Sequence, residues 1–340
     1  MTLDTDNRSN HTLRRYTTGM TLVELMVALA VGSFLILGAV QVYNQSRQAY
    51  AINDAVARVQ ETAQFAMDTI EADLRMANNW GMNSLSDAIN GRSTGVSDNP
   101  LTLTTPLDDG TSCGATWAFD LEQPVVGTDA YALPCAADNT AQTNSDTLTI
   151  RRASMATVPR AGDRLQIESN LTSGQITEDA AIPTDLAASV SQRHDLLVNT
   201  YYVDANSALI PGVPTLRRKT LASAGGNPTI NDLEVAPGVE NLQVQFGVDM
   251  NGDNTVDRYM NPGNAIINPG ATGFVPGARV LTARVWLVVR SLTPELGIVD
   301  ITDYEPGNVD LGVPADEFRR LMVSKTILLR NARAQTMGGV

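Results

Sequence analysis

An apolar stretch near the start of the chain, from Met20 to Val40, constrains the fold more than any other feature. At about 1.5 Å per residue, a helix of this length covers roughly 31 Å, enough to cross the hydrocarbon core of a bilayer. A basic segment with Arg14 and Arg15 precedes the stretch. A cleavable secretory signal has a shorter apolar core and a small-residue cleavage site after it. The pattern therefore predicts a membrane-spanning helix.

A single carboxylate, Glu24, lies within this stretch. Inside a membrane an acidic side chain is costly and usually has a partner. An uncleaved signal anchor accounts for the length of the stretch and its flanking arginines, but it gives no reason for Glu24. The order of basic leader, Gly19, Met20 and apolar helix resembles a type IV prepilin, in which the fifth mature residue is Glu. Counted from Met20, that position is Glu24.

The resemblance implies two processing steps and one assembly contact. A prepilin peptidase of the inner membrane would cleave between Gly19 and Met20 and methylate the new amine of Met20. Gly19 suits the cleaved bond because it has no side chain. Glu24 would pair with a pilin N-terminal amine, on the same subunit or on a neighbouring one.

The net charge of the chain limits the classes of molecule that it can bind. The 340 residues have a formal net charge of −13 and include only two lysines, Lys219 and Lys325. Nucleic-acid binding requires a basic footprint, so no contact with nucleic acid is expected. The positive-inside rule places the arginines of residues 1–19 in the cytoplasm. Everything after about Val42 then lies outside the inner membrane, where an acidic surface is well solvated.

The helix is expected to continue beyond the membrane stretch. Apolar residues recur in steps of three and four, which predicts one buried stripe. The helix should end near residues 78–81, where Asn and Gly can adopt a left-handed cap. The pairs Asp54–Arg58 and Glu71–Arg75 are expected on the opposite, charged face. The stripe consists of Ile52, Val56, Val59, Ala63, Ala66, Ile70, Leu74 and Ala77.

The rest of the chain indicates β-structure. Residues 84–145 have the composition of long loops with short strands, and residues 169–194 that of loops, with one helical turn expected at 186–190. Consecutive strands joined by polar turns favour an antiparallel sheet. The fold class predicted is α+β and type IV pilin-like, a long N-terminal helix whose second half packs on an antiparallel β head. Strands are expected at 147–150, 164–167, 196–203, 214–219, 239–248, 280–292 and 318–329.

Three segments resemble the PilW-type minor pilins: Gly238–Asp249, Pro214–Arg218 and Leu328–Asn331. The resemblance implies a minor pilin in the complex that primes assembly of a type IV pilus and lies near its tip. Its partners would be other minor pilins, the major pilin and a large tip adhesin. Two positions depart from the pattern. Gln41 replaces the proline common in major pilins, which points away from a major subunit, and Met82 stands where relatives often have Cys.

Two alternatives remain open. A minor pseudopilin of a type II secretion system shares the N-terminus and a similar head. A signal-anchored extracytoplasmic enzyme or binding protein would keep residues 1–19 in the mature protein. The expected divisions are 1–19 (cleaved leader), 20–42 (transmembrane half-helix), 43–80 (amphipathic half-helix), 81–195 (loop-rich part of the head) and 196–340 (β-sheet part).

The sequence offers no catalytic motif. His194 is the only histidine after the leader, and its setting indicates a loop residue. No Gly-x-Ser-x-Gly, P-loop or His-Glu-x-x-His pattern occurs, so no enzyme activity is predicted. The two cysteines, Cys113 and Cys135, predict a disulfide outside the cytoplasm, with two free buried thiols as the alternative.

One acidic loop is a candidate calcium site, the only cofactor considered. Its oxygen ligands fall at positions 1, 3, 5 and 9 of a calcium-loop spacing, and the carbonyl of Thr255 falls at position 7. Position 12, usually a bidentate Glu, is Met260, and position 6, usually Gly, is Asn254. The alternative is a polar hairpin turn. The four candidate ligands are Asp249, Asn251, Asp253 and Asp257.

Overall fold

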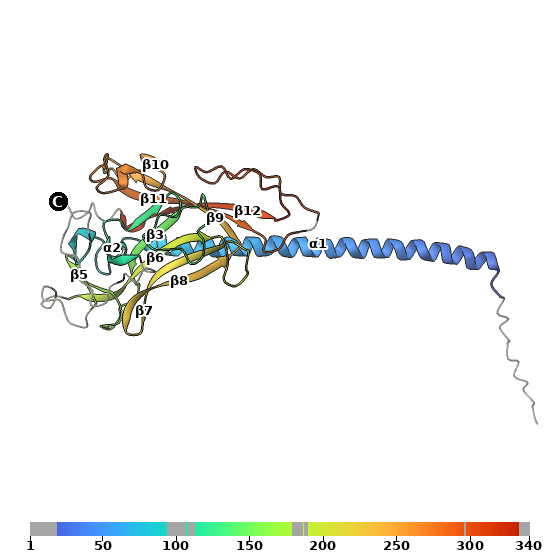
Figure 1. Cartoon of the computed structure of the whole chain (residues 1–340), viewed down its shortest axis with the longest axis horizontal. Coiled ribbons are helices and arrows are strands. Elements are labelled where there is room, and N and C mark those ends of the chain that lie inside the picture. The colour runs from blue at the N-terminus through green and yellow to red at the C-terminus, as the bar shows by residue number, and fades with distance from the viewer. Residues whose placement is uncertain are drawn as a thin grey trace, which may run out of the picture. The chain divides into compact units, whose positions relative to one another are not determined.

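The computed structural model describes residues 19–93, 107, 113–178, 186, 190–295 and 297–332. The chain divides into two compact units, residues 1–54 and 55–340. The helix α1 (Leu22–Met76) contributes to both units, and all described strands belong to the second (Figure 1). The shorter helices are α2 (Gly114–Phe119), η1 (Ser86–Ala88), η2 (Ala265–Ile267) and η3 (Arg330–Ala332).

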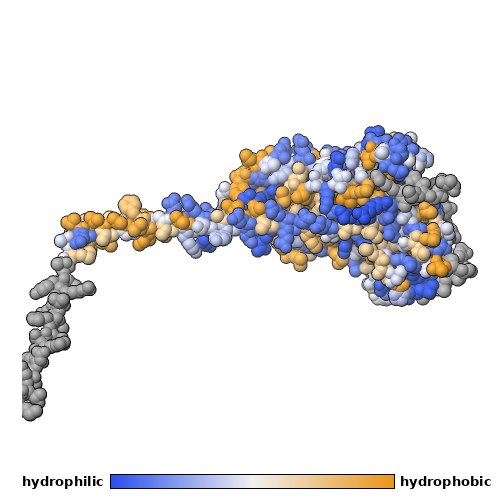
Figure 2. Space-filling model, turned by 180° about the vertical axis from the view of Figure 1, so that it is seen from behind, coloured by the Kyte–Doolittle hydropathy of each residue, from blue (hydrophilic) through white to orange (hydrophobic). Residues whose placement is uncertain are grey.

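In the first unit, the described part of α1 leaves its apolar side chains exposed. Leu22, Phe34 and Val42 are examples, and none of the large apolar residues of this segment is buried. Figure 2 shows hydrophobic residues gathered along this segment. Among the described residues, α1 is the one helix long and apolar enough to cross a membrane. This agrees with the predicted span.

In the second unit, α1 buries one stripe, as its periodicity predicts. Val59, Ala63, Ala66, Ile70 and Leu74 are all buried, and Met67 lies beside them. Ile52 and Val56 are not part of the buried stripe. The helix ends at Met76, and the left-handed backbone of Asn78 (φ 61°) follows it, as the Asn-rich end predicts.

The first sheet has eight strands, and most of its pairs are antiparallel. Its long strand β6 pairs with β3, β4 and β7, while β1 and β5 form a parallel pair. In Figure 1, β7 and β8 lie below the second part of α1. The strands are β1 (Ile89–Asn90), β2 (Val125–Thr128), β3 (Thr147–Ala153), β4 (Gln166–Ser169), β5 (Gly174–Thr177), β6 (Gln192–Asp204), β7 (Thr215–Ala224) and β8 (Asn227–Pro237).

The second sheet has four antiparallel strands in the order β10-β9-β11-β12. The central position of β11 between β9 and β12 agrees with its strongly apolar sequence. Position 247 of β9 must be glycine, because a Cβ there would lie 2.2 Å from Oγ1 of Thr282 on the neighbouring strand. The strands are β9 (Val239–Asp249), β10 (Arg258–Met260), β11 (Arg279–Arg290) and β12 (Arg320–Leu328).

Two hydrophobic clusters hold the second unit together. The helix core joins the buried stripe of α1 to apolar side chains of both sheets, with Phe246, Val285 and Leu287 among its members. The disulfide core surrounds the two cysteines and packs α2 against β4 and β6. Its aromatic members are Trp80, Trp117 and Phe119.

The structure corrects several predictions. Strands β5 and β8 lie in segments for which no strand was predicted. Glu71 is buried rather than solvent-facing, because Lys325 of β12 lies against it. His194 is a buried residue of β6 rather than a loop residue, and its ring leaves no room for a side chain at Gly81. The expected turn at 186–190 lies mostly outside the described residues.

Candidate functional site

The segment where α1 begins carries the residues expected to be processed. Gly19, Met20 and Thr21 precede the helix, and the side chain of Met20 is 62% exposed. Within the described residues, and apart from its chain neighbours, no atom lies within 4 Å of the Cβ position of Gly19. The bond between Gly19 and Met20 therefore lies in open, non-helical chain, where a peptidase can reach it.

Thr21 and Glu24 form the start of the helix. The amide of Glu24 donates a hydrogen bond to Oγ1 of Thr21 at 3.3 Å, and the amide of Leu25 donates to its carbonyl oxygen at 3.1 Å. This is the N-cap half of a capping box, and the Thr-x-x-Glu spacing of Thr21 and Glu24 is the signal in the sequence that could have predicted it. Glu24 also lies in the first turn, where the helix dipole favours a negative charge. The carboxylate is exposed and available to a partner.

A buried polar network fixes α1 to the first sheet. The carboxylate of Asp73 accepts hydrogen bonds from Arg152 at 2.7 Å, Asn199 at 2.7 Å and the hydroxyl of Tyr201 at 2.6 Å. Asp73 and Tyr201 are buried, and burial beside this carboxylate raises the pKa of the Tyr201 hydroxyl well above its ordinary value. The network sets the rotation of the helix, because only one face presents Asp73.

The opposite side of α1 is tied to the second sheet. Glu71 accepts a hydrogen bond from Nζ of Lys325 and forms an ion pair with Arg75. The side chain of Asn331 donates to the carbonyl oxygen of Ala77 at 2.9 Å. The contacts of Lys325 and Asn331 each join residues 254 positions apart, so they hold the second part of α1, from residue 55 onward, against the second sheet.

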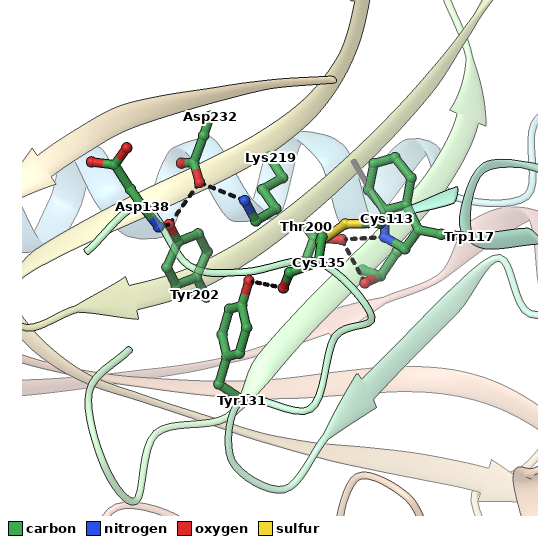
Figure 3. The surroundings of a disulfide bond; sticks show 10 residues. Cys113, Trp117, Tyr131, Cys135, Asp138, Thr200, Tyr202, Lys219 and Asp232 are labelled. Atoms are coloured by element: carbon green, nitrogen blue, oxygen red, sulfur yellow. Dashed lines mark hydrogen bonds and ion pairs between the residues drawn. A yellow bond between two sulfur atoms is a disulfide. The ribbon is translucent and has the colours of Figure 1, made fainter. Parts of the chain in front are cut away.

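The disulfide joins Cys113 to Cys135, as the sequence predicts (Figure 3). It holds α2 over the first sheet, where the indole nitrogen of Trp117 donates to Oγ1 of Thr200 at 3.0 Å. On the other side of the bond, the hydroxyl of Tyr131 donates to the carbonyl oxygen of Cys135 at 2.8 Å. The bond thus orders a segment of mostly irregular structure.

A charged cluster borders this region. Asp232 accepts hydrogen bonds from Nζ of Lys219 at 2.7 Å and from the hydroxyl of Tyr202 at 2.7 Å (Figure 3). Arg217 donates to the same carboxylate at 2.9 Å. Burial acts to raise the pKa of Asp232, but the contacts with Lys219, Tyr202 and Arg217 outweigh it and hold the pKa below its ordinary value. Every charge here has a partner within the protein, which indicates a structural role.

In the predicted calcium loop, two of the candidate carboxylates accept hydrogen bonds from amides of the loop itself. The carboxylate of Asp249 accepts the amides of Asn251, Gly252 and Asn254 and forms an ion pair with Arg279 at 3.0 Å. The carboxylate of Asp257 accepts the amide of Met250 at 2.7 Å.

These carboxylates close a hairpin turn by binding its own amides. Asp253 does the same, since it accepts the amide and hydroxyl of Thr255. Burial acts to raise the pKa of Asp249, but the amides and Arg279 hold it below its ordinary value. In the described part of the chain, no three His, Cys, Asp or Glu residues are grouped as metal ligands. The arrangement has the hydrogen bonds of a polar turn, and calcium binding by Asp249, Asn251, Asp253 and Asp257 stays a prediction.

No catalytic arrangement surrounds His194. Its Nδ1 lies 2.8 Å from the carbonyl oxygen of Ser154, and its Nε2 is buried with no hydrogen-bond partner. No carboxylate or nucleophile hydrogen-bonds the ring in the residues that the structure covers.

Two family models match the chain. The model described as Type IV Pilus-assembly protein W matches residues 200–331, which run from β6 to η3. The model described as the prokaryotic N-terminal methylation motif matches residues 14–40. The first match contains all three segments that resemble PilW-type minor pilins, and the second contains Gly19, Met20 and Glu24.

A solved structure with some likeness to the chain is a type IV-like pilin, TTHA1219, from Thermus thermophilus. The sequence identity is 13%, and the match covers 57% of this chain and 82% of that one. Its TM-score of 0.30 is too low to support a conclusion. A comparison with curated proteins finds no match.

Proposed function

We propose that this chain is a PilW-type minor pilin with a prepilin N-terminus, which acts in the complex that primes pilus assembly and lies near the pilus tip. The observation that carries the proposal is the pairing of two features in one chain. An exposed apolar helix with an N-terminal carboxylate suits insertion among other helices, and residues 200–331 of the head match the PilW model.

Processing is the first part of the proposal. Prepilin peptidase cleaves between Gly19 and Met20 and methylates the amine of Met20. The exposure of this segment and the absence of side-chain contacts at Gly19 support that assignment. Before assembly the protein spans the inner membrane once, with its N-terminus in the cytoplasm and its head in the periplasm.

Assembly is the second part. Moving from lipid into the fibre, the apolar part of α1 exchanges lipid neighbours for the helices of other minor pilins and the major pilin. Within that packing the exposed carboxylate of Glu24 pairs with a pilin N-terminal amine, because an unpaired charge among apolar helices is costly. The tip adhesin is the partner proposed for the head. The family consists of structural proteins, so no catalytic role is proposed.

The variant Glu24→Gln tests this role. It removes the charge and keeps the shape, so we expect normal membrane insertion and cleavage but loss of pili in cells that carry only the variant. Glu61→Gln is a matched control, since Glu61 is an exposed carboxylate of the same helix. Electron microscopy of pili provides the measurement. Normal piliation with Glu24→Gln would contradict the assembly role, whereas loss of pili with both variants would show a defect unrelated to the N-terminal charge.

A further inference from the structure

The strand β12 lies at the edge of the second sheet. It pairs with β11 along its whole length, from the pair Arg290–Arg320 to the pair Thr282–Leu328, without a bulge. Among the described residues, no strand pairs with its other side. A regular strand with an open side is a template for a further strand.

The hydrogen bonds of β12 alternate between its two sides. The amide of Leu329 donates to the carbonyl oxygen of Leu281 at 2.9 Å, which identifies that pair as hydrogen-bonded. In an antiparallel ladder such pairs recur at every second residue. The backbone groups of residues 321, 323, 325 and 327 therefore face β11. Those of Met322, Ser324, Thr326 and Leu328 face outward, and they have no backbone partner in the described part of the chain.

The open side of β12 lacks the usual protection against pairing. It contains no proline, and the side chains of Met322 and Leu328 are each 41% exposed. Ser324 and Thr326 between them are small and exposed. Charged side chains commonly discourage pairing at such an edge. Here the one charge in the middle of the strand, Lys325, is held by Glu71 on the face toward α1.

The charges around β12 indicate what kind of strand fits it. Arg284, opposite Thr326 on β11, lies over the rings of Tyr259 and Trp286 and has no carboxylate partner within the described residues. Arg330, just beyond the strand, is exposed and equally without a carboxylate in that part of the chain. Such uncompensated cations are unusual on a chain with a net charge of −13. An acidic segment is therefore favoured over a basic one.

We propose that β12 is a strand-addition site, which binds an extended segment of another protein with alternating apolar and acidic side chains. The backbone groups of residues 322, 324, 326 and 328 would supply the main-chain hydrogen bonds, and Arg284 and Arg330 would select carboxylates. The inference gives the head a partner and rests on the proposed function only for its biological meaning. The test below involves no pilus, so its failure and that of the assembly role are distinguishable.

Binding of designed peptides to the full chain in detergent micelles tests the site. One probe alternates valine and glutamate, and a matched probe alternates valine and lysine. We expect the glutamate peptide to bind and the lysine peptide to bind at least about tenfold more weakly. Ser324→Pro removes an outward amide without touching the bonds to β11, because proline is tolerated on the open side of an edge strand. It should weaken binding about tenfold or more, and Ser324→Ala should leave binding unchanged.

Arg284→Gln provides a second variant that keeps the backbone intact. It should reduce the preference for the glutamate peptide over the lysine peptide several-fold, even if Ser324→Pro perturbs the fold. Equal binding of the two peptides to the wild type, or full binding by Ser324→Pro, would overturn the proposal. So would a dimer of the chain that Ser324→Pro dissociates while neither peptide binds, since the occupant would then be a second copy.

Discussion

The helix core and the disulfide core stabilise the same unit by different means. The helix core is built from regular elements, the stripe of α1 and strands of both sheets, and its polar contacts join residues far apart in sequence. The disulfide core contains the short helix α2 and irregular chain, packed against the first sheet around one covalent bond.

The two cores also differ in how much of each lies in the segment that matches a known family. The segment that matches the PilW model, residues 200–331, supplies most of the strands of the helix core. It supplies only a few residues of the disulfide core, such as Leu221 and Ile230. The segment that matches the PilW model is therefore mainly the part that packs on α1, and most of the disulfide core lies outside the match. Variants in each core can show whether the two cores stabilise the unit separately.

The largest effect is expected for Asp73→Ala. It leaves the guanidinium of Arg152 and the polar groups of Asn199 and Tyr201 without their acceptor in the helix core. Breaking a buried ion pair from one side costs about 3–5 kcal/mol. Urea unfolding of the full chain in micelles measures the loss. Asp68→Ala is the control on the same helix, because Asp68 is exposed and accepts a hydrogen bond from the nearby Gln64. Equal effects of the two variants would show that the network does not hold the helix.

The double variant Cys113→Ser, Cys135→Ser should destabilise less and more locally. The bond closes a loop with a sequence separation of 22 residues, for which the chain-entropy model gives roughly 3 kcal/mol. Hydrogen exchange should show lost protection in α2 and β2, while residues 59–74 of α1 remain protected. Uniform loss across both cores would mean that they do not unfold separately and would contradict the division.

The third prediction concerns the pH dependence of stability, which we attribute to Asp146, a residue that connects the first sheet to the second. Asp146 precedes β3, accepts the amide of Val244 in β9 at 2.8 Å, and leaves its other oxygen without a donor. Burial, and to a lesser extent the nearby carboxylate of Asp129, raises the pKa of Asp146 to about 7.

The folded protein therefore holds a proton that the unfolded chain releases near pH 4. Because the pKa is raised on folding, the free energy of unfolding should fall as pH rises from about 4 to about 7, by on the order of 1 kcal/mol per pH unit at most. Asp146→Asn keeps an acceptor for Val244 but cannot titrate. Thermal melts at pH 5 and pH 8 should differ less for this variant than for the wild type, and an equal difference would remove Asp146 as the cause.

The smallest effect is expected at the turn between β9 and β10. Asp249→Asn weakens the bonds to three amides and to Arg279, which should cost about 1 kcal/mol. Because the carboxylates bind the turn itself, millimolar calcium should leave the melting temperature of the wild type unchanged. Asp253→Asn, at the exposed part of the turn, should have no measurable effect. A melting temperature that rises with calcium would restore the metal-site interpretation.

The sequence predicted the helix core well because its elements are periodic. The steps of three and four in α1, the Asn-rich end, and the alternating or strongly apolar runs of β9 and β11 are local signals. The disulfide could be predicted because the two cysteines are expected outside the cytoplasm, in an oxidising compartment. The sequence could not indicate that Glu71 is buried, because its partner Lys325 is 254 residues away. Nor could it indicate Asp73, whose partner Tyr201 is 128 residues away.

The missed elements share a different cause. The segment Asn227–Pro237 of β8 contains two prolines and two carboxylates, so its burial pattern is irregular and no alternation is visible. The strand β5 has four residues and α2 has six, too few to establish a period. The calcium site at this turn stays a prediction, because spacing does not show where a carboxylate points. The amides of the same turn already use these oxygens.

A prepilin function requires that the chain lose residues 1–19 before its helix can enter a pilus. Intact-mass spectrometry of the protein from membranes of cells with and without prepilin peptidase tests it most directly. With the peptidase we expect a single species that begins at N-methylated Met20 and lacks residues 1–19. Without the peptidase we expect the full chain. A mature protein that retains residues 1–19, or that begins elsewhere than Met20, would contradict the account.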